Sequence, residues 1–274
     1  MLSASSQRVA AYIDANRIEA LTKSAAELAW AIGTSDATVI RTVQALGFSG
    51  LPELKRELAM SYGKGFSPAD NLKRTLSIIE SDIERGISFV LSTHQEGIAH
   101  VSSDTVRKAI IEAVNVLKRA RNIAIFGIGP TAYLAGYAAA LLSRNGRRCQ
   151  VLQGAGSALA DQLLHLSGNQ ALLVMAYGRA YREVAVTIEE AQKMKLAIVL
   201  ISDSLEERYA RRADVVIPAP RGQTEHVALH ATTTACLEAL VVGIAAADQR
   251  LALSTLEKLN ELRGAIAPTP KRST

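Results

Sequence analysis

Aromatic residues and cysteines are scarce in this sequence. Phe, Trp and Tyr make up 4% of the 274 residues, whereas hydrophobic residues of all kinds reach 49%, so the apolar material is mainly aliphatic. This composition suits helices packed on helices or on a parallel sheet and disfavours an all-β sandwich. Cys149 and Cys236 are far apart and lack metal-ligand spacing, which predicts buried thiols in a reduced compartment and no metal site.

Targeting signals and unbroken apolar stretches are also missing. The amino terminus has no basic-then-apolar signal pattern, and the apolar stretch 231–247 is interrupted by three threonines and Glu238. These absences predict a cytoplasmic protein with no membrane contact. The formal net charge of +5 is compatible with a polyanionic partner.

The chain divides at a stretch rich in Gly, Ser and Pro. Residues 5–62 have helical periodicity and predict four short helices, and the composition of 62–70 predicts a linker. Five short apolar runs then alternate with helical segments, at 123–126, 148–152, 171–175, 196–201 and 214–217. Because these runs are apolar on both faces, they predict a parallel sheet covered by helices on both sides.

The predicted architecture is therefore an all-helical domain followed by a three-layer α/β domain with a five-stranded parallel sheet. Two long helices are expected at the end of that second domain, over 225–251 and 253–263. The expected boundaries are 1–66 for the helical domain, 67–120 for connecting helices, 121–264 for the α/β domain and 265–274 for a flexible tail.

Two short helices joined by a glycine turn are predicted in the first domain. Ser24 and Glu27 have the spacing of a capping box, and Gly33 is typical of a left-handed helix end. A second helix begins after Ser35 and ends at Gly47. This arrangement predicts a helix-turn-helix, in which the second helix enters the major groove of DNA.

The second helix has an apolar and a polar face. Val39, Ile40, Val43 and Leu46 are expected to point inward. The outward residues, expected to contact DNA, are Ser35, Thr38, Arg41, Thr42 and Gln44. Arg can read guanine, Gln can read adenine, and Ser or Thr can contact phosphate or a base edge. Lys55, on the next helix, is expected to contact phosphate, although any solvated helix face has a similar polarity.

Three segments resemble the RpiR family of bacterial transcriptional regulators: AAELA at 25–29, TSDATVIR at 34–41 and LGFSGLPELK at 46–55. The resemblance implies a DNA-binding module followed by a sugar isomerase (SIS) domain that senses a small anionic sugar-like effector. It implies regulation of carbohydrate metabolism and a double-stranded DNA operator as partner. Operators with two half-sites further suggest a homodimer or homotetramer.

The first apolar run of the α/β domain leads through a glycine-containing loop into a helix. Backbone amides and the positive end of the helix suit an anion there. A nicotinamide cofactor is not expected, because the third glycine of the dinucleotide pattern and the acidic residue after the next strand are both missing. The loop is similar to the first ligand loop of SIS domains, which assigns Gly127, Gly129 and Thr131 to the effector.

In SIS domains the loop after the third strand carries Ser and Thr hydroxyls around a glycine. Here the stretch MAYGRAY at 175–181 retains only Gly178 and the adjacent Arg179. Arg179 is expected either to grip phosphate or carboxylate or to be a solvated loop residue, and Tyr177 to stack on a sugar ring or narrow the pocket. Ser157, in the turn after the second strand, is either an effector contact or a helix cap.

Glu225 and His226 lie at the expected start of the long carboxy-terminal helix, where SIS enzymes can project acid and base groups. We assign both to effector binding, with a structural pair as the alternative. The predicted function is a ligand-responsive transcriptional regulator, not an enzyme. Two alternatives remain: a sugar-phosphate isomerase with an appended helical domain, using Glu225 and His226 for proton transfer, and a regulator whose SIS domain only dimerises.

Overall fold

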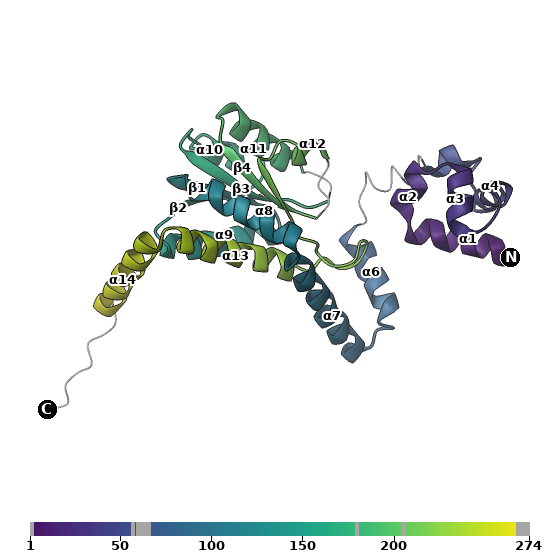
Figure 1. The fold of residues 1–274 in the computed structure, drawn as a ribbon, viewed down its shortest axis with the longest axis horizontal. Helices are drawn as coiled ribbons and strands as arrows, with labels where there is room; N and C mark the ends of the chain where they lie inside the picture. The colour runs from purple at the N-terminus through teal and green to yellow at the C-terminus, as the bar shows by residue number, and fades with distance from the viewer. Residues whose placement is uncertain (1–2, 56–57, 59–66, 179–180, 204–206, 267–274) are drawn as a thin grey trace. The chain divides into compact units, whose positions relative to one another are not determined.

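The structure is a computed structural model that describes residues 3–55, 58, 67–178, 181–203 and 207–266. The chain forms two compact units, unit 1 over Met1–Ser67 and unit 2 over Pro68–Thr274 (Figure 1). Among the described residues no single helix is long and apolar enough to cross a membrane; only a sharply bent pair of helices reaches the required length and composition together.

Unit 1 is entirely helical in its described part. Its helices are α1 (Ala4–Ala15), α2 (Arg17–Thr22), α3 (Ala25–Ile32) and α4 (Asp36–Ala45), and residues 51–55 are also helical. The prediction of four helices over 5–62 was therefore one too few. Asn16 separates α1 from α2, because its side-chain amide and its backbone N–H both donate to the carbonyl of Tyr12 and end the first helix.

The core of unit 1 is aliphatic and fully enclosed. Side chains from α1, α2, α3, α4 and the last helical segment meet there: Val9, Ile13, Ala20, Leu28, Ala29, Val39, Val43 and Leu54. Val39 and Val43 are four residues apart, which places both on the inner side of α4. The opposite side of α4 is left for solvent.

Unit 2 contains the five-stranded parallel sheet that the apolar runs predicted. The strands are β1 (Asn122–Gly127), β2 (Arg148–Leu152), β3 (Gln170–Met175), β4 (Ala197–Ser202) and β5 (Val215–Pro218). Their order is β2-β1-β3-β4-β5, with all neighbours parallel. The chain moves outward in one direction from β1 and in the other from β3. In such sheets the crevice for a ligand lies where the order reverses, at the carboxyl ends of these two strands.

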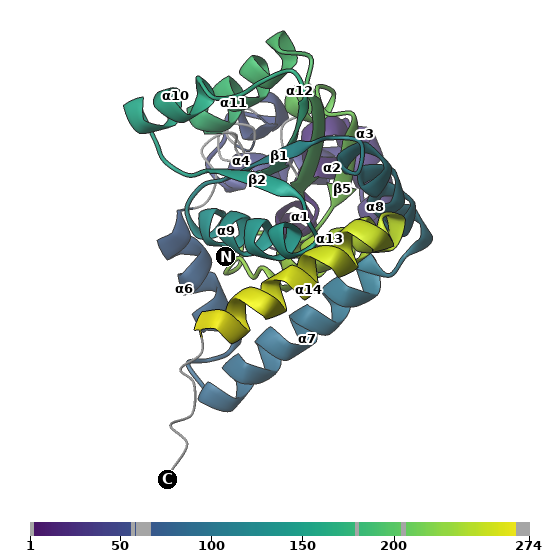
Figure 2. The same ribbon diagram turned by 90° about the vertical axis from the view of Figure 1, so that its left-hand side faces the viewer.

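Helices cover both faces of the sheet and give three layers (Figures 1 and 2). One face is covered by α8 (Asp104–Leu117) and α9 (Pro130–Arg144), with α13 (Ala231–Ala247) packed on both. The other face is covered by α10 (Ser157–Leu163), α11 (Arg182–Lys193) and α12 (Glu207–Ala210). Alternation along β1 explains the two cores: Ile123 and Ile125 face the first layer, whereas Ala124 and Phe126 face the second.

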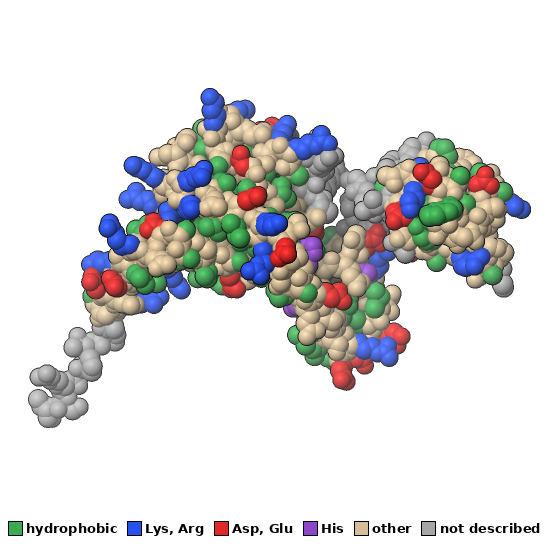
Figure 3. Space-filling model, viewed as in Figure 1, with side chains coloured by type: hydrophobic (Ala, Val, Ile, Leu, Met, Phe, Trp, Pro, Cys, Tyr) green, Lys and Arg blue, Asp and Glu red, His purple; other side chains and the backbone are tan. Residues whose placement is uncertain are grey.

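Two further helices precede this sheet domain. They are α6 (Pro68–Ile78) and α7 (Ile83–Val101). Three side chains form an apolar stripe on α7, because Ile83, Ile87 and Leu91 follow one another at four-residue spacing and are 82%, 58% and 59% exposed. Leu72 and Leu76 are exposed in the same way on α6. Figure 3 shows hydrophobic side chains at the surface over these two helices.

The helix predicted to begin at residue 225 begins instead at Ala231. Residues before it form a compact loop that is closed where the N–H of Leu229 donates to the carbonyl of Arg221, at 3.0 Å. Glu225 lies in this loop with a φ of +71°, a left-handed conformation that is incompatible with the first turn of an α-helix. We call Arg221–Leu229 the strap loop below.

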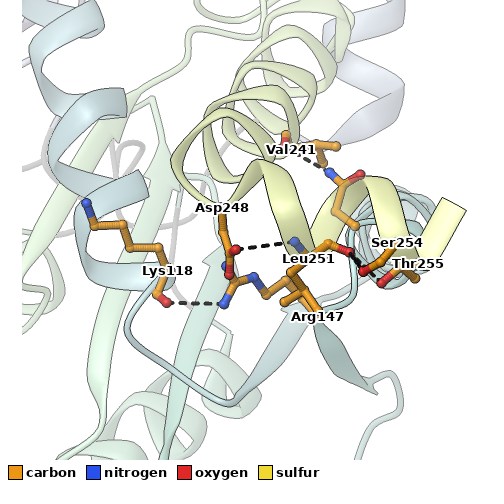
Figure 4. Close-up of polar contacts among 8 residues, drawn as sticks. Lys118, Arg147, Val241, Asp248, Leu251, Ser254 and Thr255 are labelled. Atoms are coloured by element: carbon orange, nitrogen blue, oxygen red, sulfur yellow. Dashed lines mark hydrogen bonds and ion pairs between the residues drawn. The ribbon is translucent and has the colours of Figure 1, made fainter.

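A sharp bend of 105° joins α13 to α14 (Gln249–Ile266), and Asp248 lies at the bend (Figure 4). One carboxylate oxygen of Asp248 pairs with Arg147 at 3.0 Å, and the other accepts from the N–H of Leu251 at 3.4 Å. Arg147 also donates to the carbonyl of Lys118 at 3.2 Å. Asp248 therefore caps α14 and joins the bend to the helix–strand connections beneath it.

Replacing Asp248 with alanine should lower the free energy of unfolding by about 1–2 kcal/mol, because the side chain of Arg147, only 10% exposed, loses its carboxylate. Urea denaturation measures the change. Glu261→Ala is the matched control, since the Lys258–Glu261 pair on α14 is 67% and 66% exposed and should contribute little. Equal losses in the two variants would contradict the role of Asp248.

Candidate functional site

The helix-turn-helix geometry of unit 1 follows from local hydrogen bonds. Ser24 accepts from the N–H of Glu27 through its hydroxyl, and Glu27 accepts from the N–H of Ser24 at 2.7 Å, so the predicted capping box is present. Gly33 ends α3 with a φ of +72°. Ser35 then caps α4, its hydroxyl accepting from the N–H of Thr38. Two short helices and a tight glycine turn result, as predicted.

The outer face of α4 carries most of the residues proposed to contact DNA. Ser35, Arg41 and Gln44 are exposed, and Thr38 is partly exposed. The Nε of Arg41 donates to the carbonyl of Ala37 at 3.2 Å, which lays the side chain along the helix surface. Lys55 is partly exposed on the last helical segment. Their contacts with DNA stay predictions.

Thr42 is a correction to the predicted DNA-reading face. Its side chain is fully buried, and its hydroxyl donates to the carbonyl of Thr38 at 2.7 Å. Conversely, Ile40 and Leu46 were expected inside but are 39% and 41% exposed. The inner face of α4 consists of Val39, Thr42 and Val43, at three- and four-residue spacing, so the buried stripe is narrower and rotated from the predicted one.

In unit 2, the loop after β1 brings α9 very close to the sheet. A Cβ at Gly127 would lie closer than 3.0 Å to the carbonyl group of Thr131, so only glycine fits. Gly129 caps α9 with a φ of +62° and has open space beside it. The amino end of this 15-residue helix therefore opens at the crevice between β1 and β3, as an anion site requires.

Thr131 has a structural position rather than an open one. The side chain is buried, and its hydroxyl accepts from the N–H of Ile128 and donates to the carbonyl of Ile128, both at 2.9 Å. It also lies 3.5 Å from the carbonyl oxygen of Met175 on β3. The hydroxyl thus ties the loop to the sheet, which differs from the predicted role in effector binding.

The loop after β3 also differs from expectation. Tyr177 is buried, and its hydroxyl lies 2.5 Å from that of Thr233 on α13. Burial raises the pKa of this phenol well above its usual range, so it stays neutral. A ring this buried is not available to stack on a sugar, whereas the alternative role, narrowing the pocket, stays a prediction. Gly178 follows with a φ of +62°, and Arg179 lies outside the described residues.

The sequence analysis missed Arg221, which approaches this loop from the end of β5. Its guanidinium lies 4.3 Å from the centroid of the Tyr177 ring, and its Nε donates to Asp203 at 3.0 Å. His230 meets the same tyrosine edge-on, at 5.7 Å between ring centroids. Its pKa is lowered, first by burial and then by the charge of Arg221. The sequence did contain a signal for Arg221 and Asp203. Each follows a predicted strand, and the carboxyl ends of parallel strands share one edge of the sheet.

Of the remaining predicted effector residues, one is exposed and two contact neighbouring groups. Ser157 is exposed at the first position of α10, where Gly156 is the N-cap, so the alternative of a serine cap was wrong. Glu225 forms an ion pair with Arg74 of α6. The Nδ1 of His226 lies 3.0 Å from the carbonyl of Thr224 in its own loop.

The described residues contain no group of three His, Cys, Asp or Glu side chains arranged to hold a metal ion. Burial raises the pKa of Cys149 to about 11 and that of Cys236 to about 12. Both cysteines are therefore thiols near neutral pH, and neither is a ready nucleophile.

Comparison with known families identifies both units. Residues 1–65 match the helix-turn-helix domain of the rpiR family, and residues 116–246 match the SIS domain. Unit 1 therefore belongs to the rpiR family of helix-turn-helix domains, and unit 2 contains a SIS domain. The first match covers α1 to α4, and the second covers the whole sheet and most of α13.

Three proteins are similar to this chain, two in sequence and one in fold. An uncharacterized HTH-type transcriptional regulator of Haemophilus influenzae is 27% identical over 198 residues, covering 71% of this chain and 67% of the relative. The HTH-type transcriptional regulator RpiR of Escherichia coli is 24% identical over 198 residues, covering 72% and 65%. The matches thus span about two thirds of these relatives. The Vibrio vulnificus NanR protein, solved in complex with ManNAc-6P, shares the fold with a TM-score of 0.55, 18% identity and coverage of 98% and 96%.

Replacing a glycine with alanine should have opposite effects in the tight loop after β1 and on the open surface of α9. Gly127→Ala should lower the free energy of unfolding by about 1–3 kcal/mol, because the new Cβ meets backbone atoms that cannot rotate away. Gly136 lies within α9 and has open space around it, so Gly136→Ala should raise the free energy of unfolding by about 0.5–1 kcal/mol. Thermal unfolding of both variants measures the two signs, and a neutral Gly127→Ala would contradict the close approach.

Proposed function

We propose that this protein is a DNA-binding transcriptional regulator of carbohydrate metabolism, controlled by a small anionic sugar-like effector bound in unit 2. The observation that carries the proposal is the combination, in one chain with an rpiR-family helix-turn-helix domain, of a capped α4 with a polar outer face and a sheet crevice that faces a helix amino end. The ManNAc-6P in the NanR structure supports an effector of the sugar-phosphate class for a domain of this fold.

The contacts of the residues that the alternative isomerase would need favour a regulator without enzymatic activity. Glu225 is paired with Arg74, and its side chain is only 12% exposed. His226 is turned toward Thr224 and lies 6.0 Å from the ring of Phe89. Neither side chain is arranged as a free acid or base beside the crevice, and a general base must reach the proton that it removes.

A homo-oligomer, dimer or tetramer, belongs to the same proposal. The apolar stripe of Ile83, Ile87 and Leu91 on α7 is the kind of surface that a second copy of the chain would cover. A two-fold assembly would present two copies of α4 to an operator with two half-sites. A cytoplasmic location stays a prediction.

The strap loop offers a physical route from the crevice to the DNA-binding unit. Its N-terminal residue, Arg221, lies against Tyr177, and its middle is attached to α6 by two contacts. These are the Arg74–Glu225 ion pair and the bond from the N–H of Val227 to the hydroxyl of Thr75, at 3.0 Å. In the chain, α6 is the first helix after unit 1, which contains the proposed DNA-contacting helix α4. A shift of the strap loop would therefore move the helix that follows the DNA-binding unit.

Arg41→Ala should weaken binding to an operator, selected by the wild-type protein from random duplexes, by about 1–3 kcal/mol if Arg41 contacts a base pair bidentately. Arg8→Ala on α1 removes the same charge from another exposed position and is the matched control. Fluorescence anisotropy gives the affinities, and sedimentation of the complex should give two or four chains per duplex. Absence of any selected sequence, or a single chain per duplex, would contradict the proposal.

Arg74→Gln should preserve operator affinity without effector but reduce the response to effector, because α6 loses its charged attachment to the strap loop. Coupling of this kind typically changes affinity about 5- to 150-fold, and we expect the variant to retain only a small part of that factor. The measurement is operator affinity with and without each member of a hexose 6-phosphate panel that includes ManNAc-6P. Arg85→Gln breaks the exposed Arg85–Glu80 pair on the neighbouring helix and should leave the response intact.

A further inference from the structure

Arg221 is held in one orientation by two different contacts. The Cζ atom of the guanidinium lies over the Tyr177 ring, 4.3 Å from its centroid, and Asp203 accepts from Nε at 3.0 Å. Stacking and a directional hydrogen bond together restrain a side chain that is otherwise very flexible. Among the described residues Nε is the only guanidinium nitrogen of Arg221 that donates within hydrogen-bonding distance, so the two terminal nitrogens present a fixed edge.

The guanidinium lies beside the loop after β3, although Arg221 follows the outermost strand, β5. The side chain crosses the end of β4 at Asp203 and reaches the loop after β3, where its Nη2 lies 3.9 Å from the position that a Cβ on Gly178 would occupy. Because Gly178 has no side chain, no Cβ lies between its backbone and the guanidinium. The amino end of α9 opens on the neighbouring strand, β1.

Three other polar side chains beside these loops are bonded to neighbouring groups or uncharged. The hydroxyl of Thr131 bonds within its own loop, and that of Tyr177 faces Thr233. His230, with a lowered pKa and its Nδ1 lying 3.3 Å from Thr233, is neutral near pH 7. Arg221 thus brings both a positive charge and paired N–H donors to the loop after β3, in an orientation fixed by Tyr177 and Asp203.

We propose that Arg221 binds the oxyanion of the effector, a phosphate or carboxylate group on a sugar-like molecule, together with the backbone amides that begin α9. A guanidinium edge matches two oxygens of such a group, and charge-assisted hydrogen bonds are the strong ones. The assignment rests on the proposed function for the existence of an effector. It adds the chemical class of the recognised group and the residue that recognises it.

Calorimetric titration and thermal shift with matched ligands test this assignment. The probes are hexose 6-phosphates including ManNAc-6P, hexuronates, inorganic phosphate and the neutral parent sugars. We expect the wild-type protein to bind at least one charged sugar and not its neutral parent, and Arg221→Gln to bind that ligand about 10- to 100-fold more weakly. Preference for phosphates over hexuronates, or the reverse, distinguishes the two sources of the oxyanion.

Arg212→Gln is the matched control, because Arg212 also lies over a tyrosine, Tyr209, at 5.8 Å and also pairs with a carboxylate, Glu189, but precedes β5 at the opposite edge of the sheet. It should leave ligand affinity unchanged. Arg221→Lys retains the charge without the planar edge, so it should bind several-fold more weakly than wild type even if Arg221→Gln folds poorly.

Equal binding by wild type and both Arg221 variants would overturn the assignment while leaving the regulator proposal intact. Binding of neutral parent sugars as tight as that of the charged ones would overturn it as well. If none of the charged probes binds the wild-type protein, both the assignment and the proposed effector fail. Operator binding, measured separately, then still reports on the DNA half of the proposed function.

Discussion

A parallel sheet buried on both faces meets solvent only where its strands end, and this constraint determines where unit 2 can bind a ligand. The residues along β1, β3 and β4 are almost all buried, so they contribute packing and not recognition. Recognition is left to the loops at the carboxyl edge. The chain leaves β1 toward β2 on one side and leaves β3 toward β4 on the other. The loops after β1 and β3 therefore diverge, and in such sheets a ligand crevice lies between them.

Side chains at that edge divide into those that hold the loops and those that face outward. Thr131 and Tyr177 are buried, and their hydroxyls form hydrogen bonds with neighbouring groups, which restrains the loops. Arg221 is oriented by one of these buried residues and remains partly exposed. A rigid inner layer that positions a charged outer residue is a physically sensible design for an anion site, because a preoriented guanidinium loses little freedom on binding.

The strap loop connects this edge to the first helix of the unit. Glu225 adopts a left-handed backbone conformation there, which is uncommon for a residue with a side chain, and its carboxylate is held by Arg74. The loop therefore has specific contacts with α6 through its middle as well as with Tyr177 through its first residue. Allosteric control needs an element of this kind, with contacts to both sites, since a ligand can shift an equilibrium only through differential interactions.

Much of the architecture was determined by the sequence alone, because it depends on local patterns: the capping box at Ser24, the glycine end at Gly33 and the five apolar runs each act over a few residues. What only the tertiary structure decided was which polar groups are already used. Thr42 and Tyr177 have hydroxyls like any exposed candidate. The burial of Tyr177 follows from a partner that is distant in the sequence, and that of Thr42 follows from the rotation of a whole helix. Arg221 reaches the crevice from a different strand, so no local pattern could place it beside Gly178; that depends on the order of the strands in the folded sheet.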